Sequence, residues 1–140
     1  MDILFDTNIA IDVITQREPF YEQSQLVLLL AEEKAVNGYI SATSVTDIFY
    51  ITSRLMKNKD LAKKRLKDLL FDSVEVAAVD GSIITQAIND SWDDFEDCVQ
   101  YYVGESISTD YIVTRNPDDF TSGKIKTLTP EQLLDIIAPE

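Results

Sequence analysis

The hydrophobic positions along the chain follow two alternating patterns. Short apolar runs that are typical of buried strands lie at residues 2–5, 36–41, 74–79 and 111–113, and residues 126–128 form a fifth candidate. Between these runs, apolar residues recur three and four positions apart, which is the period of an amphipathic helix. Strands that alternate with helices predict a three-layer α/β/α domain, with helices on both faces of a central parallel sheet of roughly five strands.

Polar residues between these segments predict where the helices begin and end. The expected N-caps are, in chain order, Thr7 or Asn8, Thr43 or Ser44, Asp60, Asp80 and Thr129. Gln132 stands three residues after Thr129, with Pro130 between them, and completes the pattern of a capping box. Gly104 is expected to end the helix that begins near Asp94.

Length and composition limit the number of domains and the kinds of active site that the chain can have. The 140 residues, of which 45% are hydrophobic, fit a single domain over residues 1–140 with one sizeable core. The absence of His excludes Ser-His-Asp triads, His-based ribonuclease chemistry and HExxH zinc sites. The lone Cys98 excludes an internal disulfide and is typical of a small core residue. Acid–base chemistry must therefore come from Asp, Glu, Lys, Tyr or a metal-bound water.

No segment of the sequence has the pattern of a signal peptide or of a membrane-spanning helix. The N-terminal residues include acids and no basic region, unlike a signal peptide. The longest aliphatic run, residues 26–31, is too short to span a bilayer. We therefore expect a cytoplasmic protein without a membrane partner.

Charge is distributed unevenly over a chain whose net charge is −13. Seven of the 12 basic residues and only one of the 25 acids lie between Arg54 and Lys67, so this basic segment carries +6 and the remainder −19. It is either a solvated helix face or a surface that docks RNA, whose phosphates bind Lys and Arg. Lys63, Lys64 and Arg65 are the candidate RNA contacts.

Several carboxylates are expected at one edge of the sheet. Asp6 follows the first strand and, considered alone, fits a helix cap. Asp47 lies early in the helix after the second strand, while Asp94 and Asp97 share one face of a later helix. Asn116 follows the fourth strand. Carboxylates gathered in this way repel one another unless a cation such as Mg²⁺ or Mn²⁺ lies between them, and such a metal activates water for phosphodiester hydrolysis.

Four motifs together resemble the PIN-domain family. They are Leu4–Asn8, Asp94–Asp97, Tyr111–Asn116 with Asp119 and Phe120, and Leu128–Glu131, and they follow the family's order across essentially the whole chain. The resemblance implies a five-stranded parallel sheet and a Mg²⁺- or Mn²⁺-dependent single-strand ribonuclease. Many single-domain members resemble VapC toxins of bacterial toxin–antitoxin pairs, which are commonly dimeric.

The resemblance also implies a role for each acid. Asp6 is similar to the first acid and central metal ligand. Asp97 is similar to the third acid, with Asp94 as an alternative or outer partner. Asp47 stands where the family more often has Glu, and Asn116 where many relatives have an acid. We therefore expect one firmly bound metal ion rather than two.

The remaining site residues surround these acids. The resemblance places the Thr114 hydroxyl beside a metal-bound water and lets Asn8 orient Asp6 through its amide. Asp119 either supplies a further acid or caps the turn that follows it. Arg115 is either a phosphate contact or a plain surface charge.

Other functions fit the pattern less well. A haloacid-dehalogenase-type phosphatase needs D-x-D, but the position two after Asp6 is Asn8. A receiver domain needs an extra acid pair near the first strand, which is absent, although Asp80 follows the third strand. Asp47 and Asn116 favour a catalytically impaired PIN-like binding module as the main alternative.

The expected partners follow from charge and from the resemblance. They are RNA, an antitoxin whose basic side chains enter the acidic site, and a second copy of the chain. The apolar helix at residues 20–30, or Tyr101 and Tyr102, could form the contact between copies, although ordinary core packing explains these residues better.

Overall fold

The five apolar runs pair as neighbouring parallel strands in the computed structural model, which describes residues 1–120 and 122–137. The strands are β1 (Asp2–Phe5), β2 (Asn37–Ser41), β3 (Val74–Ala77), β4 (Tyr111–Val113) and β5 (Lys126–Leu128). The helices are α1 (Thr7–Thr15), α2 (Tyr21–Glu32), α3 (Ala42–Met56), α4 (Lys59–Asp72), α5 (Gly81–Ile88), α6 (Phe95–Ser106) and α7 (Pro130–Ile137), with a 3₁₀ helix η1 at Pro117–Phe120. The order across the sheet is β3-β2-β1-β4-β5.

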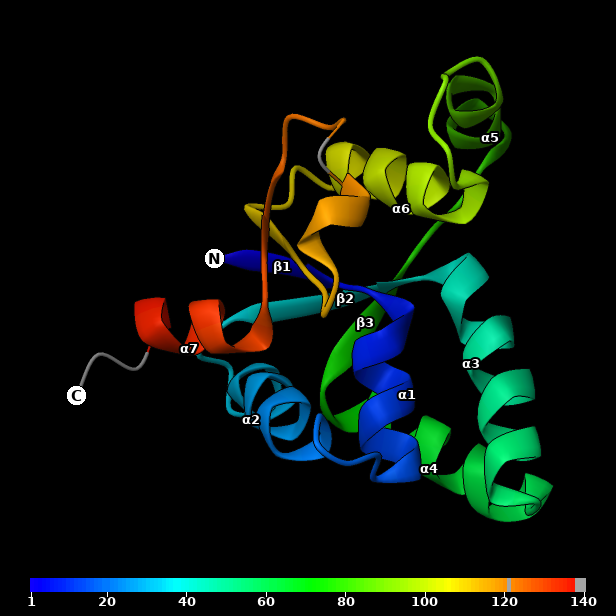
Figure 1. The fold of residues 1–140 in the computed structure, drawn as a ribbon, viewed down its shortest axis with the longest axis vertical. Helices are drawn as coiled ribbons and strands as arrows, with labels where there is room; N and C mark the ends of the chain where they lie inside the picture. Colours follow the sequence, from blue (N-terminus) through cyan, green and yellow to red (C-terminus); the bar gives the residue numbers. More distant parts are fainter. Residues whose placement is uncertain (121, 138–140) are drawn as a thin grey trace.

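Helices cover both faces of this sheet, which confirms the predicted three-layer architecture. Successive strand residues point to opposite faces, and Ile3, Leu4 and Phe5 of the central strand β1 are all fully buried. Ile3 and Phe5 pack with residues of α1, α2, α3, α4 and α7, whereas Leu4 packs with residues of α5, α6 and η1. Figure 1 shows α5 and α6 on one side of the strands and α1, α2 and α7 on the other.

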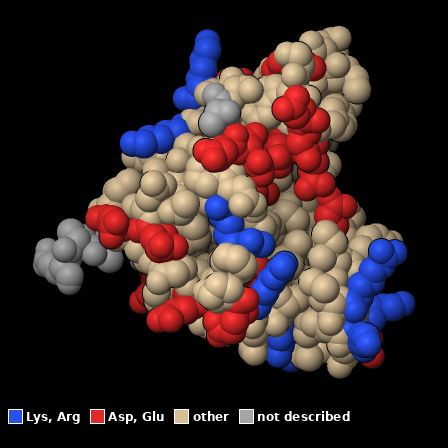
Figure 2. Space-filling model, viewed as in Figure 1, with Lys and Arg blue, Asp and Glu red and all other residues tan. Residues whose placement is uncertain are grey.

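The crossover from β2 to β3 consists of the two helices α3 and α4. Because α3 begins directly after β2 and α4 ends directly before β3, the pair carries the chain from the carboxyl edge of the sheet back to the amino edge. The basic segment Arg54–Lys67 lies at the turn between them. Figure 2 shows its cations at the lower right, apart from the band of acidic side chains higher on the molecule.

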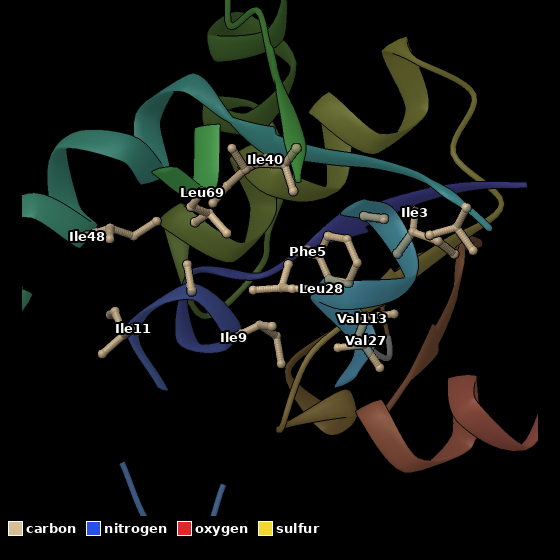
Figure 3. Close-up of a cluster of buried hydrophobic side chains, with 14 of the residues drawn as sticks. Ile3, Phe5, Ile9, Ile11, Val27, Leu28, Ile40, Ile48, Leu69 and Val113 are labelled. Atoms are coloured by element: carbon tan, nitrogen blue, oxygen red, sulfur yellow. The ribbon is translucent and has the colours of Figure 1, made fainter. Parts of the chain in front are cut away.

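The larger core cluster lies between the sheet and the helices that follow β1. Figure 3 shows Phe5 of β1 near the middle of this cluster, with Ile9 of α1 and Leu28 of α2 among its neighbours. Phe5 has no exposed surface. Truncating a buried Phe costs about 3–5 kcal/mol in other proteins, so this packing holds the end of β1, and with it Asp6, in a fixed position.

The structure corrects three predicted helix starts. Asp6 itself caps α1 by accepting a hydrogen bond from the Thr7 amide, so neither Thr7 nor Asn8 is the cap. Ser41 caps α3, ahead of the predicted Thr43 or Ser44. Asn58, not Asp60, caps α4. In each case the helix starts one to three residues earlier, because an earlier side-chain oxygen accepts a hydrogen bond from a first-turn amide.

Two predicted helix starts are confirmed, whereas the predicted ends of one strand and one helix are not. Asp80 accepts the Ile83 amide at the start of α5, and Thr129 and Gln132 form the expected reciprocal capping box. The third strand ends at Ala77 rather than Val79. Helix α6 continues past Gly104 to Ser106. Gly104 instead permits close packing, since a Cβ there would lie 3.0 Å from Ile125 Cδ1.

The two predicted contacts between copies are partly buried. Tyr101 is buried against Trp92 and Leu28 of α2 is also buried, whereas Leu26 and Leu29 on the same helix are exposed. The most exposed large apolar side chains on α3 and α5 are Tyr50, Leu55 and Ile88. None of the helices within the described residues is long and apolar enough to cross a membrane.

Candidate active site

Asp6 lies at the point where the strand order reverses. From β1 the chain goes to β2 on one side of the sheet, whereas β4, which comes much later, lies on the other side. Ligands of open parallel sheets bind outside the carboxyl ends of the strands at this place. The Asp6 amide extends the ladder by donating to the Val113 carbonyl at 2.9 Å. Asp6 and Thr114 are therefore next to each other where β1 and β4 end.

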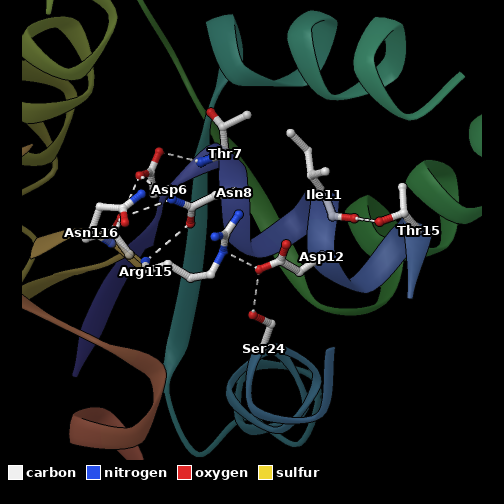
Figure 4. Close-up of polar contacts among 10 residues, drawn as sticks. Asp6, Thr7, Asn8, Ile11, Asp12, Thr15, Ser24, Arg115 and Asn116 are labelled. Atoms are coloured by element: carbon white, nitrogen blue, oxygen red, sulfur yellow. Dashed lines mark hydrogen bonds and ion pairs between the residues drawn. The ribbon is translucent and has the colours of Figure 1, made fainter. Parts of the chain in front are cut away.

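The carboxylate of Asp6 is held by four donors, two on each oxygen. Oδ1 accepts hydrogen bonds from the Thr7 amide at 2.6 Å and from Gln100 Nε2 at 2.8 Å. Oδ2 accepts hydrogen bonds from the Thr114 hydroxyl at 2.7 Å and from Asn8 Nδ2 at 3.2 Å. Figure 4 shows Asp6, Thr7 and Asn8 in this network. The Asp6 side chain therefore has a fixed orientation before any ligand binds.

Burial and hydrogen bonding have opposite effects on the pKa of Asp6. The residue is only 6% exposed. Burial raises the pKa above its usual value more than the hydrogen bonds from Thr114, Gln100 and Thr7 lower it. The nearby charge of Asp119 raises it further. A cation next to Asp6 would favour its ionised form.

Further acids from α3 and α6 surround Asp6. Burial, together with the charges of Asp6, Asp94 and Asp119, raises the pKa of Asp97 to about 7. Burial and a hydrogen bond with Asp47 raise the pKa of Glu96 to about 7. We call Asp6, Asp47, Glu96, Asp97 and Asp119 the carboxylate group. After burial, the charges of neighbouring acids contribute to the raised pKa of Asp6, Glu96 and Asp97, so these acids repel one another when all are ionised.

Asp94 and Asp119 stand at the border of this group. The side chain of Asp94 caps α6 by accepting the Asp97 amide at 2.9 Å, and its charge still acts on Asp97. Asp119 lies in η1, where its amide donates to the Asn116 carbonyl at 3.1 Å, and its charge acts on both Asp6 and Asp97. The structure thus gives Asp94 a capping function and places Asp119 beside the other acids.

The donor atoms of the carboxylate group are suited to a hard divalent cation. Over residues 1–120 and 122–137, no three acidic or cysteine side chains are arranged to hold a metal ion together. Every member nevertheless offers carboxylate oxygens, the ligands that Mg²⁺ and Mn²⁺ prefer. A cation among them would also offset the repulsion that, after burial, raises the pKa of Asp6, Glu96 and Asp97. The residues therefore fit such a metal by their chemistry.

The residues after β4 are tied to the start of α1. Asn8 Nδ2 donates to Thr114 Oγ1 at 3.3 Å, and the Asn116 amide donates to the same hydroxyl at 3.1 Å. Asn8 Oδ1 accepts a hydrogen bond from the Arg115 amide at 3.4 Å. The predicted contact between the Asn8 amide and Asp6 is present, and Thr114 is fixed on Asp6 rather than free.

Arg115 takes part in an internal ion pair. Its Nε lies 2.7 Å from Oδ2 of Asp12, which is fully buried in α1 (Figure 4). The guanidinium stacks over the ring of Phe20, 4.0 Å from the ring centroid. The Ser24 hydroxyl also donates to Asp12 Oδ2, at 3.3 Å. The side chain of Arg115 therefore joins the loop after β4 to α1 and α2.

The predicted RNA contacts of α4 lie away from the carboxylate group. Arg65 Nη1 donates to the Ile14 carbonyl at 2.6 Å, near the far end of α1. Ile14 is about 12 Å from Asp6 along the helix axis. Lys64 forms an exposed ion pair with Asp68 at 3.2 Å. Figure 2 shows this separation as distinct patches of basic and acidic side chains.

Sequence reasoning missed two residues of the site, Glu96 and Gln100. Glu96 directly precedes Asp97 and reaches Asp47 across the gap between α6 and α3. Gln100 stands one helical turn after Asp97, on the same face of α6, and reaches Asp6. The spacing of three residues between Asp97 and Gln100 is the signal that could have identified Gln100.

The raised pKa values predict how stability depends on pH. An acid whose pKa is higher in the folded than in the unfolded chain stabilises the fold below its unfolded pKa, and this contribution is lost as the pH rises through the folded pKa. With Asp97 and Glu96 at about 7, the melting temperature in EDTA is expected to fall between pH 5 and pH 8. Asp97→Asn should flatten this decrease in the same thermal melts. A melting temperature that stays constant or rises over this range would contradict the assignment.

Comparisons with known proteins agree with this geometry. The sequence model of the PIN domain matches residues 2–118. VapBC2 from Rickettsia felis, solved bound to a promoter DNA fragment, has a TM-score of 0.67 and 16% identity over 92% of this chain and 98% of its own. VapC20 of Mycobacterium tuberculosis, a toxin that cleaves the sarcin-ricin loop, has a TM-score of 0.68 and 14% identity over 86% of this chain and 95% of its own.

A third solved structure and the sequence comparison complete these findings. FitAB bound to an IR36 DNA fragment has a TM-score of 0.65 and 19% identity over 91% of this chain and 94% of its own. A comparison with curated protein sequences found no match. At these identities the solved structures establish the fold, and the family match covers most of the sequence. The chain belongs to the PIN-domain family.

Proposed function

We propose that this chain is a Mg²⁺- or Mn²⁺-dependent endoribonuclease that hydrolyses phosphodiester bonds of single-stranded or structured RNA. The observation that carries the proposal is the carboxylate group at the switch point of the sheet, where the pKa of both Glu96 and Asp97 is raised to about 7. Such a group concentrates negative charge, which a bound cation or a proton on Glu96 or Asp97 relieves. In a chain without His, a bound metal can activate water near neutral pH.

The residues of the chain divide this work among them. Asp6 and Asp97 would hold the metal, with Asp47, Asn116 and Asp94 as further oxygen ligands at the border of the site. When bound, the metal lowers the pKa of a water and stabilises negative charge on the phosphate. The Thr114 hydroxyl fixes Oδ2 of Asp6.

Proton transfer is assigned to Glu96. Its hydrogen bond with Asp47 and its pKa of about 7 let its carboxyl group hold a proton near neutral pH. A group whose pKa lies near the working pH is suited to acid–base catalysis. Glu96 therefore takes up or gives a proton at its carboxylate, and Asp47 positions it.

Cleavage of a pool of structured RNAs in Mn²⁺ tests this proposal. The protein is expected to cleave RNA with Mn²⁺ or Mg²⁺, and excess EDTA is expected to stop the reaction. Cleavage that continues in EDTA would overturn the metal requirement. Absence of cleavage with either metal would overturn the nuclease.

A catalytically impaired binding module is the second candidate, favoured by Asn116 and by the shorter Asp47. Asn116 offers a neutral oxygen where an acid would bind a cation more strongly. Calorimetry with Mn²⁺ distinguishes the two candidates. Saturable Mn²⁺ binding supports the nuclease, whereas neither binding nor cleavage would support the impaired module.

The proposal extends to the toxin of a cytoplasmic toxin–antitoxin pair. VapBC2 and FitAB are assemblies bound to DNA, and VapC20 is a toxin. Basic side chains of an antitoxin would find complementary charge at the carboxylate group. A homodimer would cover exposed apolar side chains of α3 and α5 such as Tyr50, Leu55 and Ile88.

The basic segment of α4 gives a testable RNA surface. Reversing Lys63 and Lys64 to Glu is expected to weaken RNA binding and to reduce the slope of log Kd against log salt by about 1.4, since each phosphate contact with a single strand contributes about 0.7. Arg65 stays unchanged, because it donates to the Ile14 carbonyl. Fluorescence anisotropy across a salt series provides the measurement.

The control for this test is a matched charge reversal elsewhere. Lys124 and Lys126 are exposed near β5, and their reversal to Glu changes the net charge by the same amount. If both double variants lower the slope equally, the salt dependence of RNA binding reflects the net charge of the protein and not a contact with α4. If the slope does not change in the Lys63 and Lys64 variant, α4 does not contact RNA.

A further inference from the structure

Gln100 is a buried polar residue at the centre of the site. It lies on α6, three positions after Asp97, and no part of it is exposed. Its Nε2 donates to Asp6 Oδ1 at 2.8 Å, which joins α6 to the end of β1. Gln100 therefore connects the helix that carries Glu96 and Asp97 to the most central acid.

The orientation of the Gln100 amide follows from its partner. An ionised carboxylate only accepts hydrogen bonds, so the amide nitrogen must face Asp6. The other amide atom, Oε1, is buried and has no hydrogen-bond partner within the described part of the chain. A buried acceptor left without a donor destabilises the folded chain. The hydrogen bond to Asp6 accounts for the amide nitrogen of Gln100 but not for its amide oxygen.

We propose that Gln100 is a positioning residue for a hydrated divalent cation. Its Nε2 fixes the carboxylate of Asp6, and its Oε1 accepts a hydrogen bond from a water molecule that accompanies the cation. This inference rests on the proposed function, because it requires the carboxylate group to bind Mg²⁺ or Mn²⁺. Mg²⁺ usually keeps several of its waters when it binds to protein carboxylates.

The contacts of the other Asp6 donors single out Gln100 for this function. Thr114 Oγ1 already accepts hydrogen bonds from Asn8 and from the Asn116 amide, and Asn8 Oδ1 accepts the Arg115 amide. Gln100 is thus the Asp6 donor with a buried acceptor atom still available. Partners of this kind orient metal ligands, and their loss typically weakens metal binding 10–100-fold.

Calorimetric titration with Mn²⁺ tests the inference on EDTA-treated protein. Gln100→Leu removes both polar atoms at nearly constant size and is expected to raise the Kd for Mn²⁺ at least about tenfold. Gln86→Leu is the matched control, because Gln86 is an exposed glutamine on the neighbouring helix α5. It should bind Mn²⁺ as the parent does, and circular dichroism confirms that each variant is folded.

The outcomes separate the two proposals. A folded Gln100→Leu whose Kd stays within twofold of the parent value overturns the inference and leaves the metal-dependent nuclease intact. A parent protein without saturable Mn²⁺ binding overturns the proposed function, and the inference falls with it. If Gln100→Leu does not fold, NMR of the parent decides. The side-chain amide signals of Gln100 are expected to shift on addition of Mg²⁺, and unchanged signals at saturation overturn the inference.

Discussion

Asp6→Asn is expected to abolish Mn²⁺-dependent RNA cleavage while the chain stays folded. The substitution removes a negative charge from the centre of the carboxylate group and keeps the size of the side chain. Its amide oxygen can take the position of Oδ1 and accept hydrogen bonds from the Thr7 amide and Gln100 Nε2, whereas the amide nitrogen in place of Oδ2 loses those from Thr114 and Asn8. The loss of a buried charge, whose cost is seen in the raised pKa of Asp6, offsets part of the lost hydrogen bonding.

The size of this effect follows from the position of Asp6. Loss of a partner outside the ligand shell weakens metal affinity or activity 10–100-fold, so loss of a central ligand should lower the cleavage rate more than about 100-fold. Initial rates on one RNA substrate in Mn²⁺ measure it. Asp135→Asn, an exposed acid on α7, is the control and should cleave at the parent rate. If Asp6→Asn cleaves as fast as the parent, the assignment of the active site is wrong.

The position of Asp6 could be predicted because it depends on local pattern. A short apolar run followed by a polar turn predicts a buried strand and its carboxyl end, and the alternation of strands and helices predicts a parallel sheet. Asp6 lies at that end of β1, and Thr114 at the same end of β4. The predicted approach of Asn8 to Asp6 is likewise local, because only two residues separate them.

Contacts that depend on how helices pack could not be read from the sequence. Glu96 meets Asp47 only because α6 and α3 approach the same edge of the sheet from opposite layers. The predicted function of Arg115 stayed open between a phosphate contact and a surface charge, because its partner Asp12 is distant in the chain. The helix caps were placed wrongly for a different reason. Several neighbouring Ser, Thr, Asn and Asp side chains can all cap a helix, and only backbone geometry selects one.

Arg115→Ala is expected to lower the free energy of unfolding by about 3 kcal/mol or more. The substitution leaves Asp12 fully buried, with the Ser24 hydroxyl at 3.3 Å on Oδ2. Removal of one partner of a buried ion pair is costly, because the remaining charge loses its closest counter-ion; the charge of Arg17, which acts on Asp12 less than Arg115 does, remains. Loss of the contact between the guanidinium and the ring of Phe20 adds to the effect. Urea denaturation monitored by circular dichroism provides the measurement.

The double variant Asp12→Asn, Arg115→Met separates the charge effect from packing. It removes both charges and keeps an aliphatic chain over Phe20, so it should regain at least half of the stability that Arg115→Ala loses. Equal losses in the two variants would mean that neither the uncompensated charge of Asp12 nor the aliphatic packing over Phe20 explains the effect of Arg115→Ala.

The pH dependence of the free energy of unfolding of Arg115→Ala tests independently whether the buried charge of Asp12 causes the loss of stability. Burial raises the pKa of Asp12 and Arg115 lowers it, so the alanine variant raises this pKa further. A folded pKa above the unfolded value means that stability is kept below the unfolded pKa and lost as the pH rises through the folded one. The difference in the free energy of unfolding between Arg115→Ala and the parent should therefore be largest near neutral pH and shrink towards pH 4. A deficit of constant size would show that Asp12 is not left as an uncompensated charge.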